Sequence, residues 1–104
     1  MNICDVVVGN SSSGIIEAPT LGIPTVNIGI RQKGRIKSKS IIDCNEDEIS
    51  IEKSIKKALS KSFKITAKKC LNPYYKIDTS KIIADKIFQI NPKSLLLKTF
   101  YDLK

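Results

Sequence analysis

Residues 3–30 carry the pattern that most restricts the fold of this chain: two apolar runs separated by a serine-rich turn and a short apolar stretch. The first run, "ICDVVVG", is continuous and ends at a glycine, which is typical of a parallel strand covered on both faces. The turn "NSSSG" offers several helix caps, and residues 15–21 then predict one short apolar helix that stops at Gly22, with Pro24 shortly after. "IPTVNIGI" predicts a second buried strand. A strand, a helix and a strand within about 30 residues assemble as a right-handed βαβ unit.

The rest of the chain adds a third predicted strand, "SIIDC" at residues 40–44, and two predicted helices. The acidic stretch "NEDEIS" suits the start of the first helix. Apolar residues follow it at i, i+4, i+7 and i+8: Ile51, Ile55, Ala58 and Leu59. The second helix starts near Thr79 or Ser80 and is expected to bury Ile83, Ala84, Ile87, Phe88 and Ile90. This order of elements predicts an α/β fold with a Rossmann-like parallel sheet, as one small domain or as part of a larger one.

Residue usage excludes several kinds of site. The chain has no histidine, which excludes His-based triads, His metal sites and imidazole acid–base pairs. Cys4, Cys44 and Cys70 lie far apart and form no CxxC pair, so we expect reduced, partly buried thiols, without a disulfide or a metal site. No apolar run approaches the roughly 20 residues that span a bilayer, and the first residues lack a signal-peptide pattern. We therefore expect a cytoplasmic protein with no membrane partner.

The net charge of +8 favours polyanionic partners, from nucleic acids to nucleotides. Many lysines, however, occur at solvent-face spacing in helix-like stretches such as "EKSIKKALSKSFK". Aromatic residues do not alternate with the charges early in the chain, as a base-stacking surface requires. We therefore expect no nucleic-acid partner, and keep a noncatalytic basic binding module as an alternative.

The loop "GNSSSG" lies where open α/β sheets bind their ligands, beyond the carboxyl end of a strand. Backbone N–H groups at a helix start, together with the hydroxyls of Ser11, Ser12 and Ser13, favour a phosphate or diphosphate. Small residues let the phosphate oxygens approach the backbone. The serines can equally serve only as caps and turn formers, and the loop is neither a GxxxxGK[ST] nor a GxGxxG motif.

Glu17 and Arg31 are the charged candidates near this loop. Glu17 follows the serines by about one helical turn and can accept two hydrogen bonds, as a carboxylate does from the vicinal hydroxyls of a ribose. Arg31 follows the second strand, where a guanidinium can pair with a phosphate or with Glu17. The alternatives are a first-turn glutamate favoured by the helix dipole and a solvated loop arginine. Spacing alone supports a nucleotide or phosphosugar site.

The stretch "VGNSSSGIIEAPTLGIPTVNIGIRQKGR" closely resembles a segment of the hydrolysing UDP-N-acetylglucosamine 2-epimerases of the sialic and legionaminic acid pathways. "NPYYKIDTSKIIADKI" is similar to a later segment of that family, although Ile30 stands where many relatives have Asp and residues 74–78 replace a glycine-containing turn. The resemblance implies a glycosyltransferase-B-like architecture with two Rossmann-like domains. Residues 1–104 then correspond to a partial C-terminal UDP-binding domain, with 91–104 as the C-terminal tail and the N-terminal domain absent.

The resemblance also implies a reaction and a set of roles. The family eliminates UDP from a UDP-sugar substrate and releases a 2-epimerised amino sugar such as N-acetylmannosamine, without a metal or nicotinamide cofactor. Ser11 and Ser12 resemble serines that contact the diphosphate, Glu17 the carboxylate that holds the uridine ribose, and Arg31 a basic contact near UDP. The catalytic groups are expected mostly on the absent N-terminal part, so this chain alone is expected to be inactive. The full-length enzyme is expected to be a homo-oligomer. The enzymatic alternative is a glycosyltransferase of the same architecture.

Overall fold

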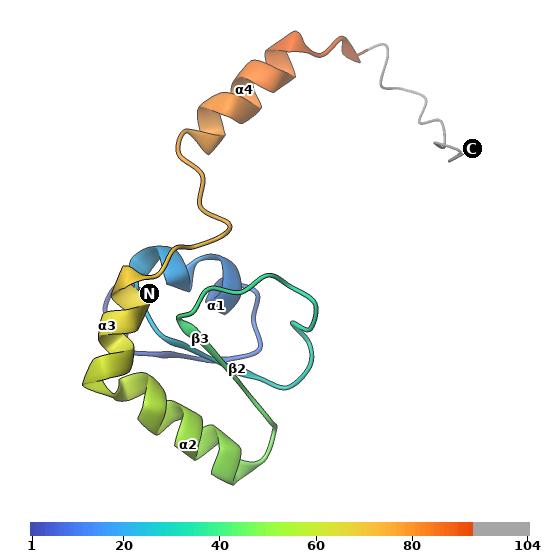
Figure 1. Cartoon of the computed structure of the whole chain (residues 1–104). Helices are drawn as coiled ribbons and strands as arrows, with labels where there is room; N and C mark the ends of the chain where they lie inside the picture. Colours follow the sequence, from blue (N-terminus) through green and yellow to red (C-terminus); the bar gives the residue numbers. More distant parts are fainter. Residues whose placement is uncertain (93–104) are drawn as a thin grey trace.

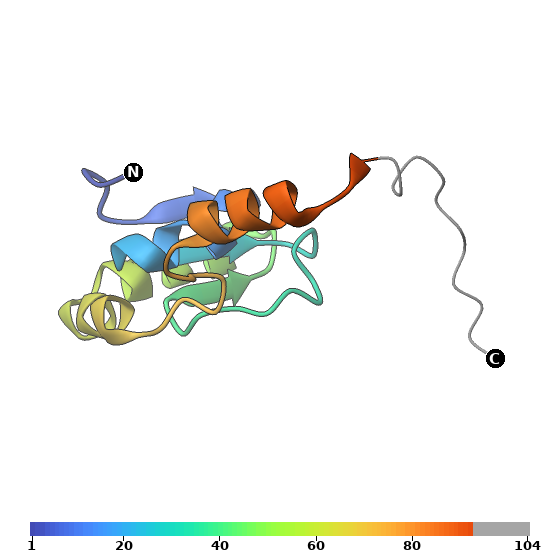
Figure 2. The same ribbon diagram turned by 90° about the horizontal axis from the view of Figure 1, so that it is seen from above.

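The protein is an α/β fold built on a three-stranded parallel sheet; the computed structural model describes residues 1–92. The strands are β1 (Val7–Gly9), β2 (Thr25–Ile28) and β3 (Ile41–Cys44), so all three predicted strands are present. The expectation that the first strand is covered on both faces is wrong: β1 is shorter than the run "ICDVVVG" and lies at the edge of the described sheet, where Val8 is exposed. Val7 pairs with Thr25, and Thr25 pairs with Ile41 on its other side. Figure 2 shows the strands in the order β1, β2, β3 across the sheet. The Rossmann-like parallel arrangement predicted from the sequence is therefore present.

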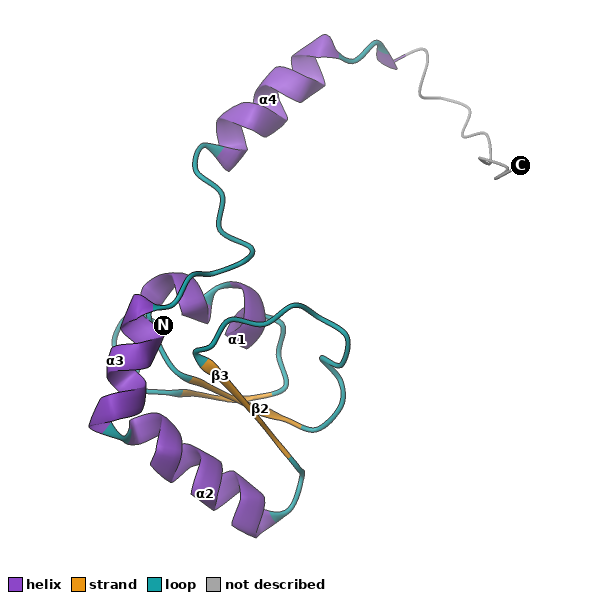
Figure 3. Ribbon diagram, viewed as in Figure 1, coloured by secondary structure: helices purple, strands orange, loops and turns teal. Residues whose placement is uncertain are grey.

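Helical elements cover the sheet on two sides (Figures 1 and 3). The short helix α1 (Ser13–Ile16) and the 3-10 helix η1 (Ala18–Leu21) lie above the strands in Figure 1, and α2 (Glu48–Leu59) lies below them. Thr25 of β2 donates from its hydroxyl to the Gly14 carbonyl of α1 at 2.9 Å, and α2 packs on β2 and β3. Thr25, Val26 and Asn27 are all buried, as a central strand covered on both faces requires.

The predicted single helix over residues 15–21 is wrong in one respect, because it breaks at Glu17. Pro19 has no N–H and therefore cannot donate to the Ile15 carbonyl. The amide of Thr20 donates to the Glu17 carbonyl at 3.0 Å, a 3-10 pattern, and does not reach the Ile16 carbonyl of the α-helical pattern. Gly22 ends η1 in the left-handed conformation (φ 66°), so the predicted stop is confirmed.

The predicted amphipathic helix is confirmed as α2, and its start has a defined cap. The Asp47 carboxylate accepts a hydrogen bond from the Ser50 amide at 2.8 Å. The helix ends before Ser60, whose hydroxyl then caps α3 (Lys61–Lys69) by accepting from the Phe63 amide at 3.3 Å. The lysine-rich stretch is therefore two helices, and α3 packs on η1.

The last described helix, α4 (Thr79–Gln89), starts where the sequence predicts, but the expected burial of its apolar side is wrong. α4 stands apart from the sheet in Figure 1, beyond the connection at residues 70–78. Asp78 begins it in the left-handed conformation (φ 59°). The spacing predicts an apolar face and not the surface that covers it. The residues expected to be buried are all exposed: Ile83, Ala84, Ile87, Phe88 and Ile90.

The cysteines and the hydropathy of the helices complete the comparison. All three thiols are free; Cys44 and Cys70 are partly buried as expected, whereas Cys4 is exposed, contrary to expectation. In residues 1–92, no helix combines the length and apolar character needed to cross a membrane. The predicted tail falls mostly outside the described residues, because 93–104 are not described.

The close approach of α1 to β2 generates a stability prediction. A Cβ atom at Gly14 would lie 2.7 Å from Cγ2 of Thr25. Gly14→Ala is therefore expected to lower the free energy of unfolding by roughly 1–3 kcal/mol, measured by urea denaturation. Adding Thr25→Ser removes Cγ2, keeps the hydroxyl donor and should recover much of the loss. A Gly14→Ala chain as stable as the wild type contradicts this packing.

The cap of α2 generates a pH prediction. Hydrogen bonds from Ser50 hold the pKa of Asp47 below its usual value of 3.8. As the pH falls, the Asp47 carboxylate is therefore protonated in the unfolded chain before it is protonated in the folded chain. The stability that the cap contributes is complete above the usual pKa and is lost as the pH falls through the lower pKa of the folded state. Asp47→Asn keeps an acceptor without titrating. It should match the wild type at neutral pH and lose less stability between about pH 5 and about pH 2.

Asp85→Asn is the matched control for that measurement, because Asp85 forms no hydrogen bond or ion pair within residues 1–92. It should leave the acid dependence of unfolding as in the wild type. If Asp47→Asn and the wild type lose stability equally over this pH range, the cap does not contribute as described.

Candidate functional site

Two polar loops meet at the carboxyl edge of the sheet. Residues 10–12 follow β1, and residues 29–40 follow β2, whose parallel direction brings both loops to the same edge. Gln32 Nε2 donates to the backbone carbonyl of Asn10 at 2.8 Å, and Gln32 is buried. Arg31 Nη1 lies 3.5 Å from Oδ1 of Asn10. The structure therefore places Arg31 beside the serine-rich loop.

The three serines differ in what they bind within the protein. Ser11 Oγ accepts from the Ser13 amide at 3.4 Å and lies 3.1 Å from Ser13 Oγ. Ser12 occupies the cap position of α1, but its side chain makes no capping hydrogen bond. Across residues 1–92, no acceptor faces the amides of Ser11 and Ser12. The loop thus has turn-forming serines at 11 and 13 and a hydroxyl at 12 that is not used as a cap.

Glu17 lies one turn from this loop, at the break between α1 and η1. Its amide donates to the Ser13 carbonyl at 2.9 Å, which fixes it relative to the serines. Its side chain is exposed, and its carboxylate has no hydrogen-bond or ion-pair partner in the described part of the chain. Arg31 contacts Asn10 and forms no ion pair with Glu17. The carboxylate therefore remains available to hydroxyl donors.

The basic residues after β2 do not act as one group. Lys37 Nζ pairs with Asp43 at 2.8 Å, and Asn27 Nδ2 donates to the same carboxylate at 2.7 Å. Ile30, next to Arg31, is 80% exposed and so does not anchor the loop in the core. Of the loop cations, Arg31 is the one that contacts the serine-rich loop within residues 1–92.

Three polar residues with structural roles near the site were not identified from the sequence: Asn10, Gln32 and Asn72. Asn10 directly precedes Ser11 and Gln32 directly follows Arg31, so their place beside predicted site residues could have identified them. Asn72 belongs to "NPYY", a segment noted for its resemblance. Its contact with α1 joins residues 56 positions apart, which no local pattern shows.

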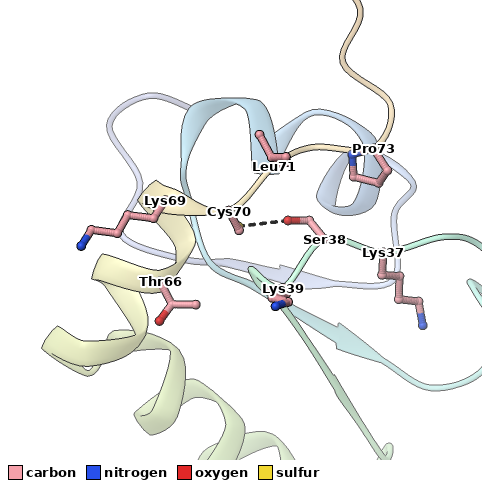
Figure 4. A pocket seen from close by; sticks show the side chains of 8 residues that line it. All are labelled: Lys37, Ser38, Lys39, Thr66, Lys69, Cys70, Leu71 and Pro73. Carbon is pink, nitrogen blue, oxygen red and sulfur yellow. Dashed lines mark hydrogen bonds between the residues drawn. The ribbon is translucent and has the colours of Figure 1, made fainter.

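A separate cavity of about 730 Å³ lies beside Ser38 and Cys70 (Figure 4). Cys70 Sγ lies 3.0 Å from Ser38 Oγ on its wall. None of the predicted site residues lines it, and mostly apolar atoms do. Its lining residues come from the loop before β3, from α3 and from the segment after α3: Lys37, Ser38, Lys39, Thr66, Lys69, Cys70, Leu71 and Pro73. We therefore place the candidate site at the sheet edge, where the predicted site residues lie, and not in this cavity.

Metal-ligating side chains do not cluster in the described part. In residues 1–92, no three Cys, Asp or Glu side chains are close enough together to hold a metal ion. The sheet edge instead offers the serine hydroxyls, backbone amides and the Arg31 guanidinium, with the Glu17 carboxylate one turn away. Fold and site together define a Rossmann-like α/β protein with polar groups gathered beyond its parallel strands.

Comparison with known proteins narrows this class. The sequence model of the UDP-N-acetylglucosamine 2-epimerase family matches residues 1–88, which is most of the chain. The chain therefore belongs to the UDP-N-acetylglucosamine 2-epimerase family.

Individual relatives agree with this family. The polysialic acid biosynthesis protein P7 of Escherichia coli is 39% identical over 101 residues, covering 93% of this chain and 25% of the relative. The GDP/UDP-N,N'-diacetylbacillosamine 2-epimerase (hydrolyzing) of Campylobacter jejuni is 39% identical over 104 residues, which cover 99% of this chain and 27% of the relative. The UDP-N,N'-diacetylbacillosamine 2-epimerase (hydrolyzing) of Legionella pneumophila is 44% identical over 57 residues, which cover 55% of this chain and 15% of the relative. The chain spans about a quarter of the length of the first two.

Proposed function

We propose that this chain is the UDP-binding part of a hydrolysing UDP-N-acetylglucosamine 2-epimerase, within a C-terminal domain of glycosyltransferase-B-like architecture. The observation that carries the proposal is the meeting of Arg31 with the serine-rich loop, in a chain of the epimerase family. Two relatives are named as hydrolyzing 2-epimerases of diacetylbacillosamine nucleotides. The proposed substrate is therefore a UDP-linked 2-acetamido sugar, either N-acetylglucosamine or a diacetamido sugar.

In this proposal the diphosphate binds between the serine-rich loop and Arg31. The amides of Ser11 and Ser12 have no internal acceptor, and the Ser12 hydroxyl is not used as a cap. Oxyanions accept hydrogen bonds from both kinds of donor. The Arg31 guanidinium, held beside Asn10, adds a positive charge from the neighbouring loop. Ser13 supports the turn through Ser11 Oγ.

Glu17 is proposed to hold the ribose. A carboxylate accepts hydrogen bonds from two vicinal hydroxyls, and the exposed Glu17 side chain has no competing partner in residues 1–92. The hydrogen bond from its amide to Ser13 fixes the spacing between the ribose contact and the diphosphate loop. In this arrangement the serine-rich loop and Arg31 bind the diphosphate, and Glu17 binds the ribose.

In the proposed reaction the sugar loses UDP from C1 and a proton from C2 to give a glycal. Water then adds at C1 and a proton returns to the opposite face of C2, which gives a free sugar inverted at C2, such as N-acetylmannosamine. The role of this chain is to bind the leaving UDP, because an anion held by amides and a guanidinium leaves more readily. The groups that remove and return the C2 proton are proposed to lie outside this chain, which has no histidine. The complete enzyme is proposed to work without a metal or nicotinamide cofactor and to form a homo-oligomer.

Calorimetric titration of the folded chain with UDP tests the proposal. We expect wild-type binding, with Glu17→Ala weaker by roughly tenfold to a hundredfold, since charged hydrogen bonds to the ribose are lost. Ser11→Ala should weaken binding by about fivefold, since it loosens the turn. Wild-type chain should also prefer UDP to 2′-deoxy-UDP, and Glu17→Ala should lose that preference.

Glu52→Ala is the matched control, because it removes the same charge from an exposed ion pair with Lys56 on α2. Its UDP affinity should equal that of the wild type. A folded wild-type chain that does not bind UDP contradicts the proposed function. An unchanged preference for UDP over 2′-deoxy-UDP in Glu17→Ala contradicts the role of Glu17 alone.

A further inference from the structure

The break between α1 and η1 leaves a backbone carbonyl without its usual helical partner. In a continuous α-helix the Ile16 carbonyl accepts from the Thr20 amide. Here that amide donates to the Glu17 carbonyl at 3.0 Å instead. A carbonyl left unpaired in this partly buried place costs free energy, so another donor is needed.

The side chain of Asn72, from the segment after α3, supplies that donor. Its Nδ2 donates to the Ile16 carbonyl at 2.8 Å and to the Thr20 hydroxyl at 2.6 Å. Its Oδ1 accepts from the Tyr74 amide at 3.0 Å. A backbone carbonyl on one side and a backbone amide on the other fix which amide atom is which. Both hydrogens of Nδ2 therefore bond to residues on either side of the break between α1 and η1.

These contacts lie on both sides of Glu17. Ile16 precedes it and Thr20 follows it by three residues, in the short η1 turn. Glu17 itself is exposed, and no side chain in residues 1–92 pairs with its carboxylate. Its position therefore depends on the backbone of the break, which Asn72 joins to the rest of the domain.

We propose that Asn72 is a positioning residue for the ribose contact: it holds the α1–η1 break so that the Glu17 carboxylate is presented to the nucleotide. This inference rests on the proposed UDP function for its effect on binding. It also ties the connection at residues 70–78, which leads to α4, to the element that carries Glu17. A displacement of that connection then changes nucleotide affinity without any contact to the nucleotide.

The test compares Asn72→Asp with the wild type in two measurements on the whole chain. Asp has the shape of Asn but no donor for the Ile16 carbonyl, and it keeps the acceptor for Tyr74. We expect UDP to bind about fivefold to tenfold more weakly, with a smaller preference over 2′-deoxy-UDP. Hydrogen exchange at the Thr20 and Gly22 amides should become faster, while the α2 amides keep wild-type protection.

Two further variants separate this effect from general damage. Asn2→Asp makes the same chemical change at an exposed residue before β1 and should leave affinity and exchange unchanged. Thr20→Val removes only the hydroxyl acceptor and should give a smaller change in the same direction as Asn72→Asp. We call the two hydrogen bonds from Asn72 Nδ2 to the Ile16 carbonyl and the Thr20 hydroxyl the anchor. Because Thr20→Val keeps Asn72 itself, it tests the anchor even if Asn72→Asp does not fold.

The outcomes distinguish the two proposals. Wild-type exchange at the Gly22 amide in both Asn72→Asp and Thr20→Val, together with wild-type exchange at the Thr20 amide in Asn72→Asp, overturns the anchor. Faster exchange with wild-type UDP affinity and wild-type preference for the ribose hydroxyl overturns the positioning role. Absence of UDP binding by the folded wild type contradicts the proposed function and with it the effect on affinity, while the exchange measurement still decides for or against the anchor.

Discussion

Parallel pairing of β1 with β2 is the constraint on which the rest of this structure depends. It requires a crossover in the short stretch between Gly9 and Thr25, and it sends the ends of both strands to the same edge. The crossover fits because α1 approaches β2 at Gly14, where the Thr25 hydroxyl bonds the Gly14 carbonyl. The loops that follow β1 and β2 then meet, through the bonds of Gln32 and Arg31 to Asn10.

Local patterns in the sequence predict the three strands and the starts of α2 and α4, but not the separate helix α3 that begins after Ser60. Continuous apolar runs indicate the strands, although only β2 is buried and Val8 of β1 is exposed, and acidic residues before a 3.6-residue period indicate α2. The break at Glu17 depends on a smaller cue, the missing N–H of Pro19, which competes with an apolar period that continues through Leu21. The exposure of α4 could not be predicted, because an amphipathic pattern specifies a face and not its partner.

The candidate site shows the same division between local and distant signals. The serines, Glu17 and Arg31 lie in one short stretch, and the nearness of Arg31 to the serine-rich loop followed from the expected βαβ unit. Their roles toward UDP stay proposals that ligand binding must test. Asn72 could not be assigned a role from the sequence, because its partner is a main-chain carbonyl freed by the break. Every residue has a backbone carbonyl, so the residue type at position 16 does not show that its carbonyl lacks a helical partner.

A nitrogen-15 NMR titration of the whole chain with UDP tests the proposed location of the nucleotide most directly. We expect the largest amide shifts at residues 10–13, at Glu17 and at Arg31 and Gln32, with little change around Ser38 and Cys70 in the separate cavity. Shifts concentrated at that cavity, or spread over the lysines of α2 and α3 without a preference for the sheet edge, would contradict the account.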